Sequence, residues 1–206
     1  PDVLVLRTEH PLTEDLRRKV ALFCNVEAGA VVESIDVSTI YEVPLRMQKE
    51  MLDQTVLRKL GLPAGEEPLL AEWKEFLHKL RNPAHRLKVA LVGKYVELAD
   101  AYKSITEAFV HAGAANEAAV ELTMIHSEEI NESNLRERLE GFDGIVVAPG
   151  FGSRGIEGKI LTVNYARTND IPFLGICLGM QCAVIEFARN VLGLEGAHST
   201  EINPKA

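Results

Sequence analysis

The chain has 206 residues, enough for one large domain or two small ones, and its net charge is −8 at neutral pH. This acidic balance argues against a nucleic-acid groove or an anionic membrane surface as the main partner, but it leaves room for a local phosphate pocket. No apolar run approaches the ~18–20 residues that a membrane span requires. Three cysteines without paired spacing favour a reducing compartment and a cytoplasmic location.

The first part of the chain, up to about residue 85, combines apolar strands with helices. Thr13 is a fitting N-cap for a helix, while Pro44 is a fitting start and Gly61 a fitting end for another. In chain order, we predict a strand over residues 3–6, a helix over 13–23, a strand over 30–35, one helix over 44–61, a linker over 63–68 and a helix over 69–80.

The second part repeats a strand–helix unit, which predicts an α/β fold with a parallel sheet covered by helices on both faces. We predict strands over residues 87–92, 119–125, 144–147 and 171–176, and helices over 101–111, 132–140, 158–168 and 178–192. Glycines 113, 141 and 193 are expected to end three of these helices. In such sheets the chemistry gathers at the carboxyl ends of the strands.

Cys177 stands between the last strand and the last helix, with Gly175 and Gly179 two residues away on each side. This is the nucleophile-elbow pattern with cysteine in the place of serine. Larger residues at the two glycine positions would collide with the strand or the helix, and the helix N-terminus favours a thiolate. Free cysteines are more often buried apolar residues, and we interpret Cys24 and Cys182, which lack glycine flanks, as structural.

The glycine-rich loop over residues 148–155 follows the strand 144–147 directly. A cysteine that performs acyl transfer needs N–H donors for the tetrahedral oxyanion. We expect the N–H groups of Leu178 and Gly150 to be those donors. A glycine-rich loop by itself is a simple turn as often as a site, but its place beside the elbow favours a site. Arg154 in this loop offers a bidentate fork for a phosphate or a carboxylate.

Four stretches identify a family. Residues 175–181 (GICLGMQ) resemble the nucleophile motif of class I glutamine amidotransferases. Together with residues 21–26 (ALFCNV), 92–104 (VGKYVELADAYKS) and 150–155 (GFGSRG), they closely resemble the CTP synthase family over essentially the whole chain.

The resemblance implies a division of the chain into three parts. Residues 1–43 would be the C-terminal part of an amidoligase (synthetase) domain of P-loop-like α/β fold, and residues 44–85 a helical interdomain linker. Residues 86–206 would be the first half of a flavodoxin-like glutamine amidotransferase domain. Both ends of the sequence are expected to lie within a longer protein.

The resemblance also implies a cytoplasmic ligase of pyrimidine biosynthesis. Glutamine is hydrolysed through a thioester on a cysteine, and the ammonia passes to the synthetase domain. There UTP, activated by phosphorylation from ATP, is aminated to CTP. ATP and Mg²⁺ would bind through ligands outside this chain, and GTP would act as an allosteric activator. Members of the family form homotetramers and can form filaments.

Individual roles follow from the same resemblance. Cys177 is the nucleophile, and the contacts to glutamine and the oxyanion fall to Gly150, Leu178, Gly179, Met180, Gln181 and Glu201. Nucleotide binding falls to Lys19, Ile35, Asp36 and Val37, and GTP coupling to Arg154. From the residues alone, Lys19 would be a solvated surface charge, Asp36 could equally cap the next helix, and Glu201 would be an exposed loop carboxylate.

The family's histidine base belongs to a His-Pro-Glu motif that this sequence does not contain. His126, which ends a strand, is the nearest substitute among the histidines present. No Walker motif occurs either, so we expect the isolated chain to be inactive in both half-reactions. Two alternatives are another Cys-elbow hydrolase of flavodoxin-like fold, such as the intracellular protease/deglycase group, and a non-catalytic assembly module. The segment before residue 87 disfavours the first alternative.

Overall fold

The computed structural model describes residues 1–65, 69–98 and 100–203. The chain divides into two compact units, residues 1–78 and residues 79–206, which we call the N-terminal unit and the C-terminal unit. Part of the predicted linker, residues 66–68, lies outside the described residues. None of the described helices has the length and apolar character needed to cross a membrane.

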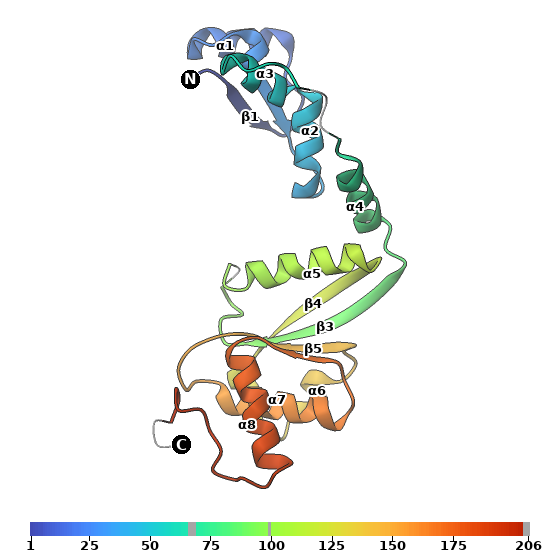
Figure 1. The fold of residues 1–206 in the computed structure, drawn as a ribbon, viewed down its shortest axis with the longest axis vertical. Coiled ribbons are helices and arrows are strands. Elements are labelled where there is room, and N and C mark those ends of the chain that lie inside the picture. Colours follow the sequence, from blue (N-terminus) through green and yellow to red (C-terminus); the bar gives the residue numbers. More distant parts are fainter. Residues whose placement is uncertain (66–68, 99, 204–206) are drawn as a thin grey trace. The chain divides into compact units, whose positions relative to one another are not determined.

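The N-terminal unit is built on two parallel strands, β1 (Leu4–Thr8) and β2 (Val31–Ile35), which helix α1 (Glu14–Cys24) connects (Figure 1). Thr13 caps α1 as predicted, because its Oγ1 accepts a hydrogen bond from the N–H of Leu16 at 3.3 Å. Two short 3₁₀ turns complete this part of the unit, η1 (Ala28–Ala30) and η2 (Ile40–Glu42). The predicted strands and the first predicted helix are therefore confirmed.

The prediction of one helix over residues 44–61 is wrong, because the chain forms two helices there, α2 (Val43–Lys49) and α3 (Leu52–Lys59). Met51 separates them in the left-handed region, with φ of 55° and ψ of 36°. Neither glycine nor proline marks this break in the sequence, so the helical pattern runs through it. The residue before the break makes a contact with the sheet.

That contact is made by Glu50, which lies directly before the break. Its Oε2 accepts a hydrogen bond from the N–H of Glu33 in β2 at 3.2 Å, and a second from the guanidinium of Arg17 at 3.3 Å. The carboxylate thus ties the end of α2 to both β2 and α1. A local sequence pattern cannot report such a contact, because its partners are 17 and 33 residues away.

Replacing Met51 by glycine is expected to raise the stability of the N-terminal unit by about 0.5–1 kcal/mol, because only glycine adopts a left-handed backbone without steric cost. Leu60→Gly is the matched control, since Leu60 is also exposed but has a right-handed backbone, with φ of −84°. That variant should be slightly destabilised. Amide hydrogen exchange in α2 and α3 measures both effects, and a destabilised Met51→Gly protein would contradict the prediction.

Helix α4 (Ala71–Arg81) follows the linker and carries part of an aromatic cluster. The ring of Phe76 lies 5.2 Å from that of Tyr41 in an edge-on arrangement, and the indole N–H of Trp73 donates to the carbonyl oxygen of Tyr41 at 2.7 Å. These contacts pack the apolar face of α4 against η2, as expected of an amphipathic helix.

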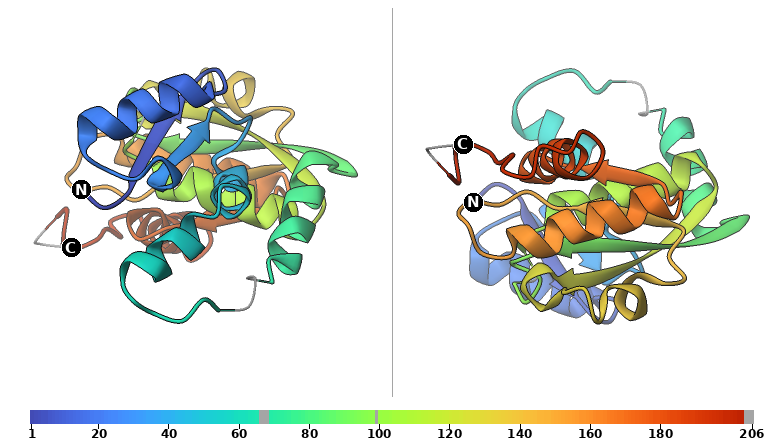
Figure 2. Two further views of the ribbon diagram at one scale, coloured as in Figure 1. Left: turned by 90° about the horizontal axis from the view of Figure 1, so that it is seen from above. Right: turned by 90° about the horizontal axis from the view of Figure 1, so that it is seen from below.

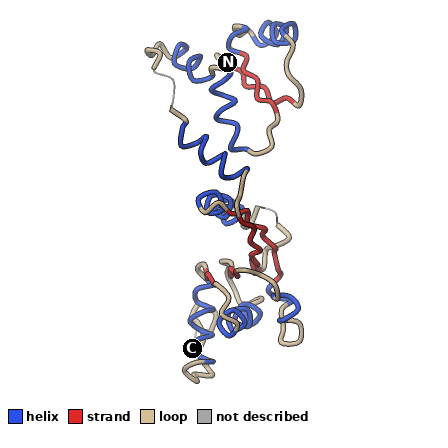
Figure 3. Tube along the Cα trace, turned by 90° about the vertical axis from the view of Figure 1, so that its right-hand side faces the viewer, coloured by secondary structure: helices blue, strands red, loops and turns tan. Residues whose placement is uncertain are grey.

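The C-terminal unit contains a four-stranded parallel sheet in the order β4-β3-β5-β6, which confirms the predicted α/β class (Figures 1 and 3). Its strands are β3 (His85–Gly93), β4 (Ala118–His126), β5 (Gly144–Val147) and β6 (Phe173–Gly175). The strand order reverses between β3 and β5. In open sheets of this kind, ligands bind at the carboxyl ends of the strands beside such a reversal.

Helices cover both faces of this sheet (Figures 1 and 2). Helix α5 (Lys103–Ala115) packs on one face, and α6 (Leu135–Leu139), α7 (Ile156–Thr168) and α8 (Leu178–Asn190) pack on the other. Strand β3 accordingly buries side chains in both directions: Ala90 and Val92 face α7 and α8, while Val89 and Leu91 face α5. This explains its continuous apolar run.

Several helix ends differ from prediction: α7 begins at Ile156 instead of residue 158, and α8 ends at Asn190 instead of residue 192. Gly113 lies inside α5 instead of ending it. Glycine is needed there for packing, because a Cβ atom would come within 2.5 Å of the carbonyl oxygen of Ala118. Helix α6 is shorter than the predicted 132–140. The side chains of Asn131 and Asn134 bond to the backbone ahead of it and hold a turn there.

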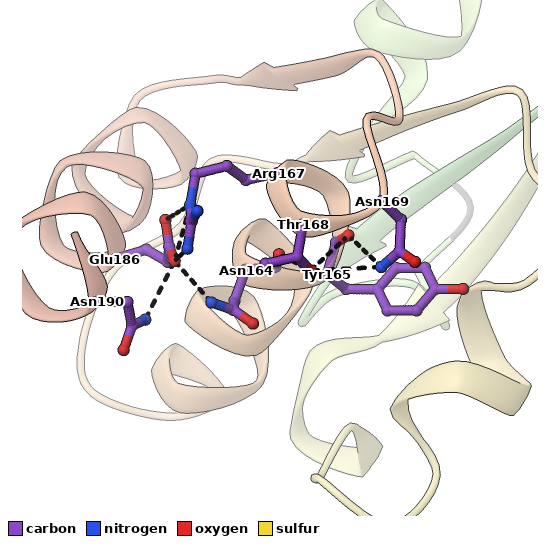
Figure 4. A network of polar contacts seen from close by, with 7 residues as sticks. All are labelled: Asn164, Tyr165, Arg167, Thr168, Asn169, Glu186 and Asn190. Carbon is purple, nitrogen blue, oxygen red and sulfur yellow. Dashed lines mark hydrogen bonds and ion pairs between the residues drawn. The ribbon is translucent and has the colours of Figure 1, made fainter.

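Helices α7 and α8 are joined by a polar network around Glu186 (Figure 4). This carboxylate, only 1% exposed, accepts hydrogen bonds from Arg167 at 2.8 Å, Asn164 at 2.8 Å and Asn190 at 3.1 Å. Burial alone would raise the pKa of Glu186, but these hydrogen bonds outweigh burial and lower it. The network fixes α8, the helix that Cys177 precedes, against α7.

Candidate active site

Cys177 occupies a strained turn between β6 and α8. Its backbone has φ of 53° and ψ of −105°, a conformation that non-glycine residues rarely adopt, and its side chain is exposed. A Cβ atom at Gly175 would lie 2.5 Å from the carbonyl carbon of Gly179, and one at Gly179 would lie 2.1 Å from the carbonyl oxygen of Val147. The predicted need for glycine on both sides of the cysteine is confirmed.

The two predicted oxyanion donors lie close together. Leu178 is the first residue of α8, so its N–H has no partner within the helix. Gly150 is buried, and a Cβ atom on it would lie 3.7 Å from Leu178 Cδ2. Over the described part of the chain, no protein acceptor receives a hydrogen bond from either N–H. Both donors therefore remain available to an oxygen atom beside Cys177.

Two buried lysines hydrogen-bond to backbone carbonyls of the loop at residues 148–152. Sequence analysis did not identify either of them. Lys159 Nζ donates to the carbonyl oxygens of Ala148 at 2.7 Å and Pro149 at 3.5 Å. Lys94 Nζ donates to the carbonyl oxygen of Phe151 and, at 3.2 Å, to that of Gly152. Burial lowers the pKa of Lys94, and it lowers the pKa of Lys159 to about 8.

A signal for Lys159 was present in the sequence. It falls in the apolar stripe of α7, four residues before Val163 and three after Ile156, both of which are core residues. A lysine on the buried face of a helix needs a specific partner. Lys94 gives a weaker signal, as the residue directly after β3.

Gln181 and Glu201 also come together. Gln181 Nε2 donates to Glu201 Oε2 at 3.0 Å, and its Oε1 accepts from the hydroxyl of Ser199 at 2.8 Å. Met180 lines a different surface, a hollow of about 370 Å³ on α8 that also includes Val184 and Phe187. The structure thus places Gln181 and Glu201 side by side, with Met180 on an exposed apolar face.

Arg154 is exposed and pairs with Glu128 at 3.1 Å. Glu128 belongs to the short turn η3 (Ser127–Glu129) that follows β4. The glycine loop is therefore joined to the carboxyl end of β4 through an ion pair. The guanidinium already has one carboxylate partner.

In the N-terminal unit, Lys19 is exposed on α1, while Ile35 ends β2 and is followed by Asp36 and Val37. Asp36 does not cap the next helix. It pairs with Arg7 at 2.8 Å, and this hydrogen bond lowers the pKa of Asp36. A hollow of about 420 Å³ in this unit includes none of these predicted residues, being lined by Glu14, Arg17, Ala28, Gly29, Lys49, Glu50 and Met51.

His126 is not placed to act as the base. It ends β4, which β3 and β5 separate from β6, so it lies roughly 14 Å across the sheet from the elbow, at about 4.8 Å per strand. Its Nδ1 accepts a hydrogen bond from the N–H of Glu128 at 3.3 Å. The structure therefore does not support His126 as a substitute base. Cys182 is buried as predicted, but Cys24 is exposed.

The strand order, the cysteine elbow and the adjacent glycine loop define a class I glutamine amidotransferase. Family models agree: "Glutamine amidotransferase class-I" matches residues 97–204 and "CTP synthase N-terminus" matches residues 1–62. The chain belongs to the CTP synthase family, which confirms the resemblance drawn from the sequence. The match at residues 1–62 also disfavours a Cys-elbow hydrolase of another family.

Named relatives support the same family. The chain is 64% identical over 203 residues to the CTP synthase of Cytophaga hutchinsonii and 61% identical over 202 residues to that of Flavobacterium psychrophilum. Each match covers 98% of this chain but only 38% of the relative. A solved structure, the glutaminase domain of Trypanosoma brucei CTPS with bound acivicin, matches at 41% identity with a TM-score of 0.55. This match covers 58% of this chain and 47% of that chain.

Proposed function

We propose that this chain contributes the nucleophile of a CTP synthase, a ligase that aminates UTP to CTP with ATP and with ammonia released from glutamine. One observation supports this above all. The exposed Cys177 lies on a strained elbow directly before Leu178, and a Cβ atom on Gly150 would lie 3.7 Å from Leu178 Cδ2. Neither the N–H of Leu178 nor that of Gly150 has a protein acceptor among the described residues. That arrangement suits attack of a thiolate on an amide carbonyl.

The reaction at this site is an acyl transfer. The Cys177 thiolate attacks the side-chain amide carbon of glutamine, and the carbonyl oxygen takes the negative charge. The N–H groups of Leu178 and Gly150 stabilise that oxyanion. The carbon–nitrogen bond then breaks, the nitrogen leaves as ammonia after gaining a proton, and water hydrolyses the thioester to glutamate. Among the described residues no histidine bonds to Cys177, so we assign the proton transfers to none of them.

Recognition of glutamine would use the other side of the elbow. We assign the substrate amino group to Glu201, whose carboxylate is held at Gln181. Gly179 allows the close packing that places the start of α8, and Met180 lies beside it. Arg154 would transmit GTP binding through its pair with Glu128.

The nucleotide half of the reaction involves the N-terminal unit. We propose that Lys19 contacts nucleotide phosphates and that Ile35, Asp36 and Val37 contact ATP, largely through their backbone. The described residues hold no cluster of three or more His, Cys, Asp or Glu side chains suited to a metal ion, so we route no step through Mg²⁺ here. The three-part division at residues 43 and 85, the homotetramer and the cytoplasmic location belong to the same proposal.

Acivicin, the compound bound in the Trypanosoma brucei glutaminase structure, provides the test. In the full-length protein it should alkylate Cys177, and glutamine should protect that residue. Peptide mass spectrometry reads all three cysteines at once. The exposed Cys24 is the internal control for general thiol reactivity. Equal labelling of Cys24 and Cys177, or labelling that glutamine does not slow, would overturn the proposed function.

A further inference from the structure

The two buried lysines hydrogen-bond to backbone carbonyls on both sides of Gly150. We propose that Lys159 and Lys94 are positioning residues that set the direction of the Gly150 N–H toward the oxyanion. This inference rests on the proposed function. Neither lysine touches the reacting atoms, and each acts through the main chain.

In a planar peptide bond, the direction of a carbonyl fixes the direction of the N–H that follows it. The carbonyl of Pro149 and the N–H of Gly150 belong to one planar trans peptide, so they point in opposite directions. Lys159 Nζ holds the carbonyls of Ala148 at 2.7 Å and Pro149 at 3.5 Å. With those oxygens directed at the buried ammonium, the N–H of Gly150 faces away from it.

Lys94 holds the loop on the other side of Gly150. It follows β3 at the point where the strand order reverses, and it donates to the carbonyls of Phe151 and Gly152. A Cβ atom at Gly150 would lie 2.9 Å from Lys94 Cε and 3.7 Å from Lys159 Nζ. Gly150 is therefore packed against both lysine side chains, and hydrogen bonds from the lysines hold the carbonyls of the residues before and after it.

The surroundings of Lys159 do not suit a merely structural cation. It is fully buried, four residues into α7, where the helix dipole disfavours positive charge, and no carboxylate pairs with it in the described structure. The titratable groups that face it are Cys177, Cys182 and Lys94. An apolar side chain would fill this position at less cost, so the ammonium is retained for its carbonyl contacts.

Lys159→Met in the full-length protein tests the role. We expect kcat for glutamine hydrolysis to fall about 10- to 100-fold, while KM changes less than about threefold. Alkylation of Cys177 by iodoacetamide forms no oxyanion, so its rate should also stay within about threefold. Thr162→Val is the matched control, since Thr162 is fully buried on the same helix and its hydroxyl donates to the carbonyl oxygen of Gly158, away from the loop.

The pH dependence gives a second readout. Burial lowers the pKa of Lys159 to about 8, so the ammonium loses its proton as pH rises through that value and donates more weakly. The ratio of wild-type to Lys159→Met kcat should therefore fall above about pH 8, and titrations common to both proteins cancel in it. Burial raises the pKa of Cys182 to about 11, which keeps that thiol protonated in this range.

The outcomes separate the two proposals. A wild-type protein without glutaminase activity overturns the proposed function, and the positioning role with it. An active wild type with a Lys159→Met variant that matches Thr162→Val overturns the positioning role alone. The positioning role alone is also overturned if Lys159→Met slows hydrolysis and alkylation equally, or if the ratio of wild-type to Lys159→Met kcat does not change with pH. If Lys159→Met does not fold, Lys94→Met replaces it as the test. We expect the same result, a lower kcat for glutamine hydrolysis with a nearly unchanged rate of Cys177 alkylation.

Discussion

Replacing Cys177 by serine in the full-length protein is expected to abolish glutamine-dependent CTP formation while leaving the ammonia-dependent reaction intact. The elbow places the thiolate for attack, whereas a serine hydroxyl stays protonated and is a weak nucleophile. Loss of a nucleophile that acts as part of a catalytic unit lowers kcat by at least about 10³-fold. Initial rates of CTP formation with glutamine, and separately with ammonium chloride, measure the two half-reactions.

Cys182→Ala is the control for this prediction. Cys182 lies five residues further along α8, fully buried in the core that faces the sheet. Its loss should lower stability but keep the ratio of glutamine-dependent to ammonia-dependent rate near that of the wild type. A Cys177→Ser protein that still hydrolyses glutamine would remove the cysteine from the mechanism. Loss of both reactions would mean that the substitution damages the fold.

The elbow was predictable because its constraints are local. Gly175 and Gly179 are required by backbone atoms within four residues and by the neighbouring strand, and the pattern of apolar strand, glycine, cysteine and helix displays this in one stretch. The strand positions were predictable for a related reason. Strands buried on both faces, such as β3, appear as continuous apolar runs.

The remaining features depend on contacts between distant segments. The break at Met51 coincides with a hydrogen bond between Glu50 and β2, a partner 17 residues away. Lys94 hydrogen-bonds to the glycine loop, whose carbonyls at Phe151 and Gly152 lie 57 and 58 positions later in the chain. His126 shows the converse: the end of a parallel strand is the right edge of the sheet, but the strand order decides how far it lies from Cys177. A sequence pattern predicts at which edge of the sheet a residue lies, but it does not predict the order of the strands.

The second large effect is expected in stability. Arg167→Met should lower the free energy of unfolding of the C-terminal unit by more than the loss of an exposed ion pair does, because it leaves a buried carboxylate without its cation. Arg167 donates to Glu186 from Nη2 at 2.8 Å and from Nε at 3.0 and 3.2 Å (Figure 4). Asn164 and Asn190 remain as donors to the carboxylate, and solvent reaches Arg167, so both reduce the loss.

The pH dependence identifies the cause of that loss. The folded protein holds the pKa of Glu186 below its ordinary value of 4.5, so this carboxylate contributes stability above that pH and loses the contribution as pH falls through the lowered pKa. The difference between wild type and Arg167→Met should therefore be full at pH 7 and shrink below about pH 4. Adding Glu186→Gln to Arg167→Met should recover part of the loss at pH 7, since it removes the unpaired charge.

Arg136→Met is the matched control, because Arg136 pairs with Glu140 at 3.2 Å on the same unit but both side chains are largely exposed. Such a pair contributes no more than about 0.5 kcal/mol. Amide hydrogen exchange in α7 and α8 of the full-length protein measures the local stability of every variant. Equal effects of Arg136→Met and Arg167→Met would show that burial of Glu186 does not set the strength of this contact. In that case the placement of α8, and of Cys177 at its start, must depend on the apolar core beneath the two helices.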